Sequence, residues 1–248
     1  MSEYIVKSES LSAIADAIRA RSGATGTLSF PDVFINKITA LSNGDDWKAM
    51  IERGGGTTRI TTLPSDLTKI GDYAFASWTF LDSISLPEGI TSIGKRAFMD
   101  CISLRLTSLP EGITTIGQDA FRNCRSMTLT SLPAGLTEIA STAFYECSNL
   151  RLASLPEGIT SIGQGAFTLC SLTLTSLPAG LMSIGSNAFA YCNIKTMTFK
   201  GTPSSIESCF SGCTNLTTIN VPWAEGAVAN APWGATNATI NYNYTVEA

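Results

Sequence analysis

A hydrophobic motif recurs along most of the chain at an almost constant interval. Phenylalanine returns every 23 residues, and the interval shortens to 22 and then 21 in the last two repeats: Phe75, Phe98, Phe121, Phe144, Phe167, Phe189 and Phe210. Cysteine follows three residues later in six repeats: Cys101, Cys124, Cys147, Cys170, Cys192 and Cys213. Trp78 takes that place in the first repeat, and Leu-Pro pairs such as Leu86-Pro87 recur in step. The pattern predicts seven repeated turns over residues 57–222.

A unit of this length cannot bury its own apolar side chains, so successive units must stack and share one core, as in a solenoid. Parallel strands of neighbouring turns lie about 4.8 Å apart, which makes a seven-turn stack roughly 30 Å long. Equivalent residues then form ladders through the core. We expect these ladders to consist of Phe, Ala, Leu, Ile and Cys, as in the series Ile93, Ile116, Ile139 and Ile162.

The seven cysteines raise the question of metal binding or disulfide formation. Zinc sites use closely spaced Cys or His ligands, and the chain has neither a Cys-x-x-Cys pair nor a histidine. Ladder neighbours that point in parallel into a core have poor geometry for the disulfide dihedral angle. We therefore expect the ladder cysteines to be reduced, and to be buried in the way that small hydrophobic residues are. Cys209 falls outside this ladder.

Residues 1–56 have a different pattern. Leu11, Ile14, Ala15 and Ile18 follow the spacing of an amphipathic helix, with Ser10 as its N-cap. A second helix is expected from Pro31 to the residue before Gly44, and a shorter third one from Asp46 to the glycines at 54–56. This helical segment either caps the open end of the solenoid, as terminal repeats require, or serves as a docking or oligomerisation module.

Residues 223–248 predict a C-terminal β cap. Ile240, Tyr242 and Tyr244 alternate with polar residues, which is typical of a strand with one buried face. The strand either covers the unpaired edge of the last turn or returns along the sheet. Trp223 and Trp233 are expected to pack beneath it, and the alternative role for their rings is stacking on a sugar.

The composition restricts the function. The net charge of −4 and the lack of a basic patch argue against nucleic acid as a partner, because phosphate binding needs clustered Lys and Arg. No apolar run is long enough for a membrane span, and residues 1–10 lack the features of a secretory signal, so we expect synthesis in the cytoplasm. Catalysis without histidine would need a carboxylate pair, a lysine or an activated cysteine, and acids such as Glu88, Glu111 and Glu157 occur singly. We predict a protein that is not an enzyme and that binds no cofactor or metal.

The motif in the sequence LPEGITSIGKRAFMDC resembles the BspA-like leucine-rich repeat family over residues 60–222. The resemblance implies an α/β solenoid, a leucine-rich repeat stack of about seven turns with a parallel β-sheet. The first, sixth and seventh turns keep the family's strand pattern, as in Leu81, Ile84 and Leu86. The second to fifth turns depart from it, with the order Leu104, Leu106 and Leu109 in the second. A bulge or a different strand register is therefore expected there.

The two ends of the chain resemble segments of phage and prophage structural proteins. The similar stretches are SLSAIADAIRARSGATGTLSFPDVFINKI near the start and VPWAEGAVANAPWGATNATINYNY near the end. This resemblance implies a tail-associated protein that becomes part of the virion and leaves the cell by lysis.

The predicted function is binding or adhesion through a rigid repeat surface, with a protein or glycan on a cell surface as ligand, because solenoids present extended surfaces. The alternatives are a purely structural component that contacts other phage proteins, and an enzyme. The candidate site is the sheet before each Leu-Pro pair, where polar residues recur in register. They are Arg105, Thr107, Ser108, Thr128, Thr130, Ser131, Arg151, Ser154, Thr173, Thr175 and Ser176. The arginines can hold a carboxylate or sulfate, although Thr is also simply a good strand residue.

Overall fold

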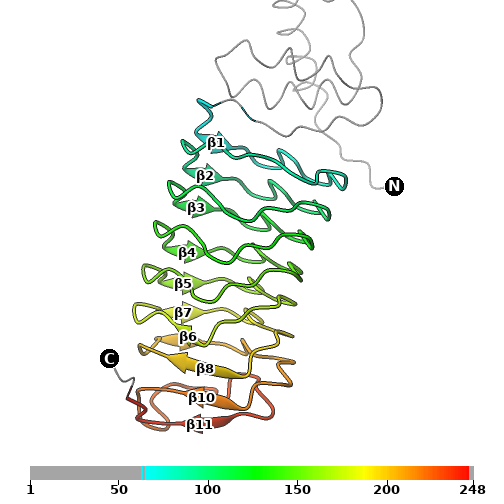
Figure 1. Ribbon diagram of the computed structural model, residues 1–248. Coiled ribbons are helices and arrows are strands. Elements are labelled where there is room, and N and C mark those ends of the chain that lie inside the picture. Colours follow the sequence, from blue (N-terminus) through cyan, green and yellow to red (C-terminus); the bar gives the residue numbers. More distant parts are fainter. Residues whose placement is uncertain (1–62, 64, 246–248) are drawn as a thin grey trace, which may run out of the picture. The chain divides into compact units, whose positions relative to one another are not determined.

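The computed structural model describes residue 63 and residues 65–245, and this part of the chain is a parallel β-solenoid of about eight turns (Figure 1). Its strands are β1 (Lys69–Ile70), β2 (Ser92–Ile93), β3 (Thr115–Ile116), β4 (Glu138–Ile139), β5 (Ser161–Ile162), β6 (Ser176–Leu177), β7 (Ser183–Ile184), β8 (Thr196–Phe199), β9 (Ser205–Ile206), β10 (Thr218–Asn220) and β11 (Thr239–Asn241). No helix occurs among these residues, so the α/β assignment is wrong for this part of the chain. The helices expected within residues 1–56 lie outside the described residues.

The strands form sheets on two sides of the stack. The strands that follow a Leu-Pro pair, or its equivalent in the seventh turn, form two parallel sheets, β1-β2-β3 and β4-β5-β7-β9. The strands at the end of the later turns form a third sheet in the order β11-β10-β8-β6. Equivalent residues pair directly, as Ile70 does with Ile93 and Ile93 with Ile116. The exact register follows from the inward isoleucine of each short strand, because a shift of one residue would expose it.

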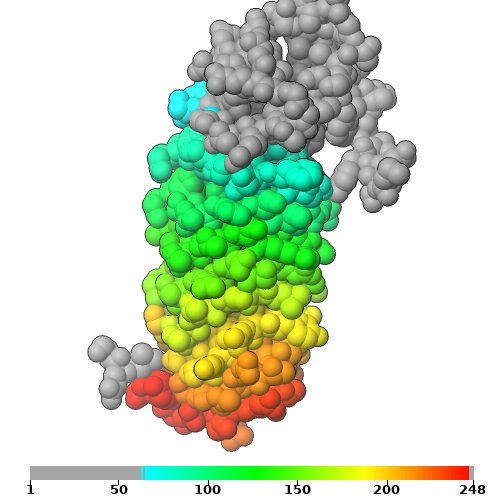
Figure 2. All heavy atoms as spheres, turned by 45° about the vertical axis from the view of Figure 1, so that its right-hand side comes forward, coloured from blue at the N-terminus to red at the C-terminus, as the bar shows by residue number. Residues whose placement is uncertain are grey.

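A column of phenylalanine rings runs through the centre of the stack. The seven Phe residues of the repeat are all buried, and successive rings are stacked with centroids 5.0–5.7 Å apart and planes within 20° of each other. Such aromatic pairs add about 0.5–1.5 kcal/mol each to the stabilisation from burial. The 23-residue interval therefore determines which rings meet. In space-filling view the successive turns lie as bands along this unit (Figure 2).

The recurrent cysteine is explained by a hydrogen bond between turns. The buried Cys124 Sγ donates to the carbonyl oxygen of Phe98 in the preceding turn at 3.1 Å, and Cys147 Sγ donates to Phe121 at 3.0 Å. The other four ladder cysteines repeat this contact. All seven cysteines are free and buried, which confirms the predicted burial. Cys209 fills the place of the alanine before Phe210, a position that the sequence reading left unassigned.

Burial also makes these thiols unreactive. It raises the pKa of Cys101 to about 12 and the pKa values of Cys124 and Cys147 well above the usual range. In the native protein, at a pH near the usual thiol pKa of about 8.5, the ladder thiols should react with a thiol reagent at least about a thousandfold more slowly than in denaturant. Mass spectrometry after timed labelling measures this, and rapid native labelling of several ladder cysteines would contradict the ladder.

A row of glycines permits close approach of neighbouring turns. A Cβ atom at Gly117 would lie 2.6 Å from the backbone nitrogen of Lys95, and one at Gly163 would lie 2.5 Å from that of Ser141. Ala140 occupies the same position in the fourth turn. The backbone bond that Gly117 donates to Ile93 at 2.8 Å has no counterpart at Ala140 among the described residues. The sheet is interrupted here, between β3 and β4, where Figure 1 shows a wider step.

The segment around each Ala-Phe pair consists of tight bends rather than a helix. Left-handed backbone recurs two residues before and two residues after the phenylalanine, as at Arg96 (φ 54°) and Asp100 (φ 61°) in the second turn. The N–H groups of these two residues donate to the next turn, to Gln118 at 2.9 Å and to Arg122 at 2.8 Å. Non-glycine residues adopt this conformation at a cost, which the hydrogen bonds between turns offset.

The C-terminal segment adds an eighth turn. Strand β11 pairs with β10 in parallel, so it extends the sheet over the edge and does not return along it. The carbonyl of Trp233 accepts a hydrogen bond from Phe210 N–H at 3.0 Å, as an ordinary turn would. Trp223 and Trp233 are 6 % and 0 % exposed, and both rings contact Phe199. The predicted packing of the tryptophans is confirmed, and their burial excludes the sugar-stacking alternative.

Candidate binding face

The strand segments at the ends of the second to fifth turns differ from the others by an outward bulge. In the second turn Leu104, Leu106 and Leu109 are buried, whereas Arg105, Thr107 and Ser108 are exposed. Two consecutive residues therefore point outward just before the leucine of Leu-Pro. This settles the register that the sequence left open. No strand is assigned over 105–109, 128–132 or 151–155, so the expectation of a regular sheet before each Leu-Pro pair is wrong for these turns.

The bulged turns align their outward residues in three rows, which we call the polar face. The first row begins with Arg105, the second with Thr107 and the third with Ser108. The rows are Arg105, Thr128, Arg151 and Thr173; Thr107, Thr130, Ala153 and Thr175; and Ser108, Ser131, Ser154 and Ser176. All are exposed except Ser176, which is half-buried. Every residue predicted for the candidate site thus lies on one face, at the spacing of the turns. No ligand contact follows from this position alone.

The bulge also leaves backbone groups unpaired. Backbone hydrogen bonds join the turns at the first row, where Thr128 N–H donates to Leu106 at 3.0 Å and Arg151 N–H to Leu129 at 3.1 Å. Within the described part of the chain, the N–H groups of Thr107 and Ser108 make no backbone hydrogen bond. Exposed amides of this kind are solvated, and a polar ligand can replace that water at little cost.

A shallow hollow of about 440 Å³ lies where the polar face begins, between the first and second turns. The sequence pattern changes at this junction. Ile84 points inward in the first turn, but Thr107, its equivalent in the second, points outward. Because the inward residues do not stack here, the two segments leave a space between them. Its lining comprises Ser83, Ile84, Ser85, Leu86, Glu88, Arg105, Leu106, Thr107, Ser108, Leu109 and Pro110.

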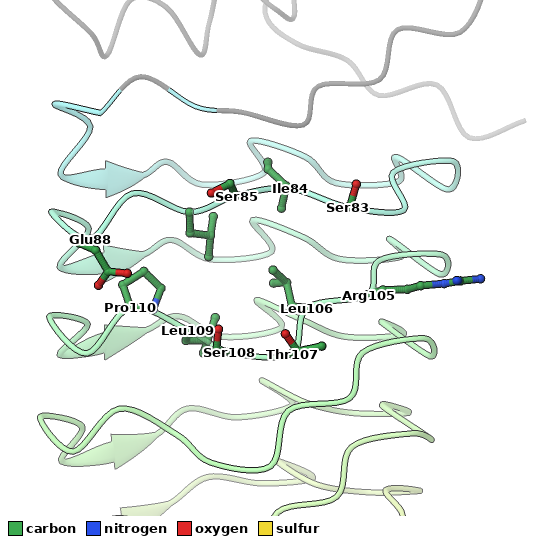
Figure 3. A pocket seen from close by; sticks show the side chains of 11 residues that line it. Ser83, Ile84, Ser85, Glu88, Arg105, Leu106, Thr107, Ser108, Leu109 and Pro110 are labelled. Atoms are coloured by element: carbon green, nitrogen blue, oxygen red, sulfur yellow. The ribbon is translucent and has the colours of Figure 1, made fainter.

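Figure 3 shows how the hollow is built. Ser85 and Glu88 lie toward one end, and the Arg105 side chain extends away at the other. The sequence reading identified Arg105, Thr107 and Ser108 but missed Ser83, Ser85 and Glu88. The change in leucine spacing between the first and second turns was the signal that could have located them.

A buried carboxylate lies at the tight bends around the Ala-Phe pairs, which we call the bend side of the stack. Asp119 is 2 % exposed and accepts hydrogen bonds from Arg96 Nε at 3.0 Å and Thr142 Oγ1 at 2.6 Å. Arg122 lies 3.6 Å from the carboxylate and over the ring of Tyr145. Burial by itself raises the pKa of Asp119, but the hydrogen bonds from Thr142 and Arg96 and the charge of both arginines lower it more, so the net shift is downward. The group ties three adjacent turns together.

Asp119→Asn should lower the free energy of unfolding by about 2 kcal/mol at neutral pH, because the neutral amide removes the negative charge that pairs with Arg96 and Arg122. A carboxyl whose pKa is lower in the folded protein than in the unfolded chain stabilises the fold at pH values above its unfolded pKa of about 3.9. This stabilisation is lost as the pH falls through the pKa of the folded state. The difference between the wild-type protein and the variant should therefore shrink as the pH falls from about 4 toward 2. Denaturant titrations across this range test it.

The matched control is Glu157→Gln, which alters the exposed pair of Glu157 with Lys200 and should change stability by less than about 0.5 kcal/mol. Equal losses in both variants, or an Asp119 effect that persists at low pH, would contradict the assignment.

The described residues contain no cluster of candidate metal ligands. No group of three or more Cys, His, Asp or Glu side chains in residues 65–245 could hold a metal ion. Two of the three glutamates that follow Leu-Pro make contacts of their own: Glu157 pairs with Lys200 Nζ at 2.7 Å, and Glu111 Oε2 accepts a hydrogen bond from Ala134 N–H at 3.4 Å. No described helix is long and apolar enough to cross a bilayer. What this geometry can do is present polar groups at fixed positions.

Among solved structures, a leucine-rich cell surface protein from Faecalibacterium prausnitzii A2-165 is 31 % identical, with a TM-score of 0.59. The match covers 67 % of this chain and 48 % of that one, so this chain spans about half the length of that relative. A leucine-rich repeat protein from T. pallidum is 28 % identical over 66 % of this chain and 72 % of its own, with a TM-score of 0.49. No curated protein matches the chain.

The family comparison covers the solenoid. The model for the BspA type leucine-rich repeat region matches residues 57–153 and 137–224 in six copies. It covers neither the N-terminal segment that resembles phage proteins nor the C-terminal one beyond residue 224, and that resemblance stays a prediction. The repeat, the stacked phenylalanine and cysteine ladders and this match agree, and the chain belongs to the BspA-type leucine-rich repeat family.

Proposed function

We propose that this protein is a non-enzymatic binding protein and that the polar face is its recognition surface. The observation that carries the proposal is the alignment of three outward polar rows over four successive turns, held by a rigid core. Because the rows repeat at the turn spacing of about 4.8 Å, a ligand with its own repeat can make the same contact several times. The proposed ligand is a protein or glycan at a cell surface, in keeping with the cell-surface description of the F. prausnitzii relative.

The bulge supports this role. A regular sheet would pair its backbone groups between turns, whereas the bulged turns leave the amides of Thr107 and Ser108 available to a ligand. Thr130 and Ser131, the equivalent residues in the next turn, are also exposed. Solvent-exposed hydroxyl and amide groups supply hydrogen-bond donors and acceptors that suit either the hydroxyls of a sugar or the backbone of a peptide.

Thr130→Trp combined with Ser154→Trp should block this face, because both positions are exposed and a large ring there prevents a ligand from lying on the rows. The readout is binding of the full chain to arrays of glycans and of extracellular proteins. We expect the signals of the wild-type protein to fall at least about tenfold, a loss of about 1.4 kcal/mol in binding free energy.

The matched control is Thr114→Trp combined with Thr137→Trp, which places the same rings on exposed threonines elsewhere on the stack. Circular dichroism spectra should show that both variants are folded. The proposal fails if the polar-face variant retains every signal, or if the control loses the same signals to the same extent.

A further inference from the structure

The first row of the polar face continues into the sixth and seventh turns. Lys195 and Thr217 are the equivalent residues there, both exposed, and Thr217 N–H donates to the carbonyl of Lys195 at 3.0 Å. The row therefore reads Arg105, Thr128, Arg151, Thr173, Lys195 and Thr217. A positive charge stands on every second turn, and a threonine separates each from the next.

Arg105, Arg151 and Lys195, like Lys69 and Lys95, have no ion-pair partner among the described residues, whereas four other cations are paired. Arg96 and Arg122 pair with Asp119, Arg125 with Glu146, and Lys200 with Glu157. Among the described residues, Arg105, Arg151 and Lys195 form no ion pair and no side-chain hydrogen bond. The protein thus neutralises the arginines on its bend side and leaves the charges of this row free.

The six segments that carry this row have no acidic residue of their own, although Glu88 lines the same hollow as Arg105. The segments 103–109, 126–132, 149–155, 171–177, 193–199 and 215–221 contain no Asp or Glu, although the chain has 20 acids and a net charge of −4. The neighbouring row on one side is neutral and polar as well: Ser103, Ser126, Asn149, Ser171, Asn193 and Asn215. The row ends at Asp82 in the first turn. Over six turns the first row is therefore a line of unpaired cations, and the side chains that flank it are uncharged and can form hydrogen bonds.

We propose that this line binds an acidic polysaccharide that carries one carboxylate or sulfate on every second sugar. The inference rests on the proposed function and specifies its ligand. Two turns separate successive cations by about 10 Å, and two linked sugar rings span a similar length. Each arginine fork can hold an anionic group in bidentate geometry, and the flanking Ser, Thr and Asn side chains face the sugar hydroxyls.

Other polyanions fit less well. Side chains on one side of an extended acidic peptide recur at about 6.6 Å, which does not match two turns. Nucleic acid carries charges at closer spacing and is bound by many more cations, together with aromatic rings that stack on its bases. The six segments present no exposed aromatic side chain; their one ring, Phe199, is buried.

The experiment uses the full chain and hyaluronan oligosaccharides of four, six and eight sugars, which carry one carboxylate per disaccharide. By calorimetry, affinity should increase from four to six sugars and then level off, because six sugars supply three carboxylates for Arg105, Arg151 and Lys195. Binding should weaken between about 50 and 200 mM salt. Replacing all three cations with Gln should raise the Kd at least about tenfold, since each exposed ion pair contributes up to about a fivefold change.

Two variants serve as controls. Arg125→Gln removes a paired arginine that is not part of the row and should leave the Kd within about twofold. The charge-preserving pair Arg105→Lys with Arg151→Lys should lose less affinity than the triple Gln variant, because it keeps the charges and loses only the bidentate geometry. The inference is overturned if the triple Gln variant binds like the wild-type protein, if the wild-type protein does not bind the octasaccharide, or if polyglutamate of equal charge binds more tightly. If the protein still binds neutral ligands and the variant Thr130→Trp with Ser154→Trp loses that binding, the proposed function stands without this ligand class. If no ligand depends on the polar face, both the proposed function and this inference fail.

Discussion

Phe121→Ala is expected to lower the free energy of unfolding by about 3–5 kcal/mol, because it leaves a cavity in a column that cannot close around it. Phe121 is fully buried, and its ring stacks on Phe98 at 5.3 Å and on Phe144 at 5.6 Å. In a solenoid, stability is approximately the sum of contributions from each turn and each interface between turns. A cavity in the third turn weakens two interfaces at once, so the stack should separate into two cooperative units.

Denaturant unfolding followed by circular dichroism measures this loss. The matched control is Phe80→Ala, because the Phe80 side chain is 86 % exposed and its truncation should change stability by less than about 0.5 kcal/mol. Similar losses for both variants would show that the ring column does not hold the turns together. A single sharp transition in Phe121→Ala with unchanged midpoint would have the same meaning.

Trp233→Ala should have an effect of similar size, about 3–5 kcal/mol, but confined to the end of the stack. The Trp233 ring is fully buried, contacts Phe199 and Trp223, and donates from Nε1 to the carbonyl of Ala229 at 2.8 Å. Since each turn contacts only its neighbours, loss of this ring should open the eighth turn and leave the central turns intact.

Hydrogen exchange distinguishes the two variants. In Trp233→Ala the amides of β10 and β11 should lose protection, whereas those of β2 and β3 should keep it. Tyr244→Ala is the control in the same segment, because Tyr244 is 41 % exposed. Loss of protection along the whole stack in Trp233→Ala would mean that the solenoid unfolds as one unit, contrary to this expectation.

The sequence was sufficient for the solenoid because the repeat length and the apolar ladders constrain the fold together. A 23-residue interval brings Phe98 beside Phe121 in any stacked arrangement, and the small cysteine at a fixed offset must then be buried. Arg105, Thr107 and Ser108 were named as polar candidates, but the order Leu104, Leu106 and Leu109 left their strand register open. The core ladders were therefore predictable residue by residue, whereas the outward direction of the polar rows was not.

Other features depended on contacts between turns that no single repeat shows. The cysteine could be identified as small and apolar, but its acceptor, the carbonyl of the phenylalanine in the preceding turn, exists only once the turns are stacked. Cys209 was unassigned because its repeat lacks the usual alanine, and the structure shows that the thiol fills that place. The eighth turn was missed because Trp233 replaces the Ala-Phe motif, although its carbonyl makes the same hydrogen bond.

The sequence by itself thus determined the period and the core ladders, because every repeat places its apolar side chains at the same positions and these must be buried. The register of the polar residues in the second to fifth turns was decided by the tertiary structure. Tertiary structure decided which backbone groups pair and where the sheets break. Ala140 in place of glycine adds one methyl group where two backbones nearly touch, and β3 and β4 part there. The hollow beside Arg105 arises in the same way, because Ile84 and Thr107 take opposite directions in adjacent turns, and such a mismatch exists only between two turns in contact.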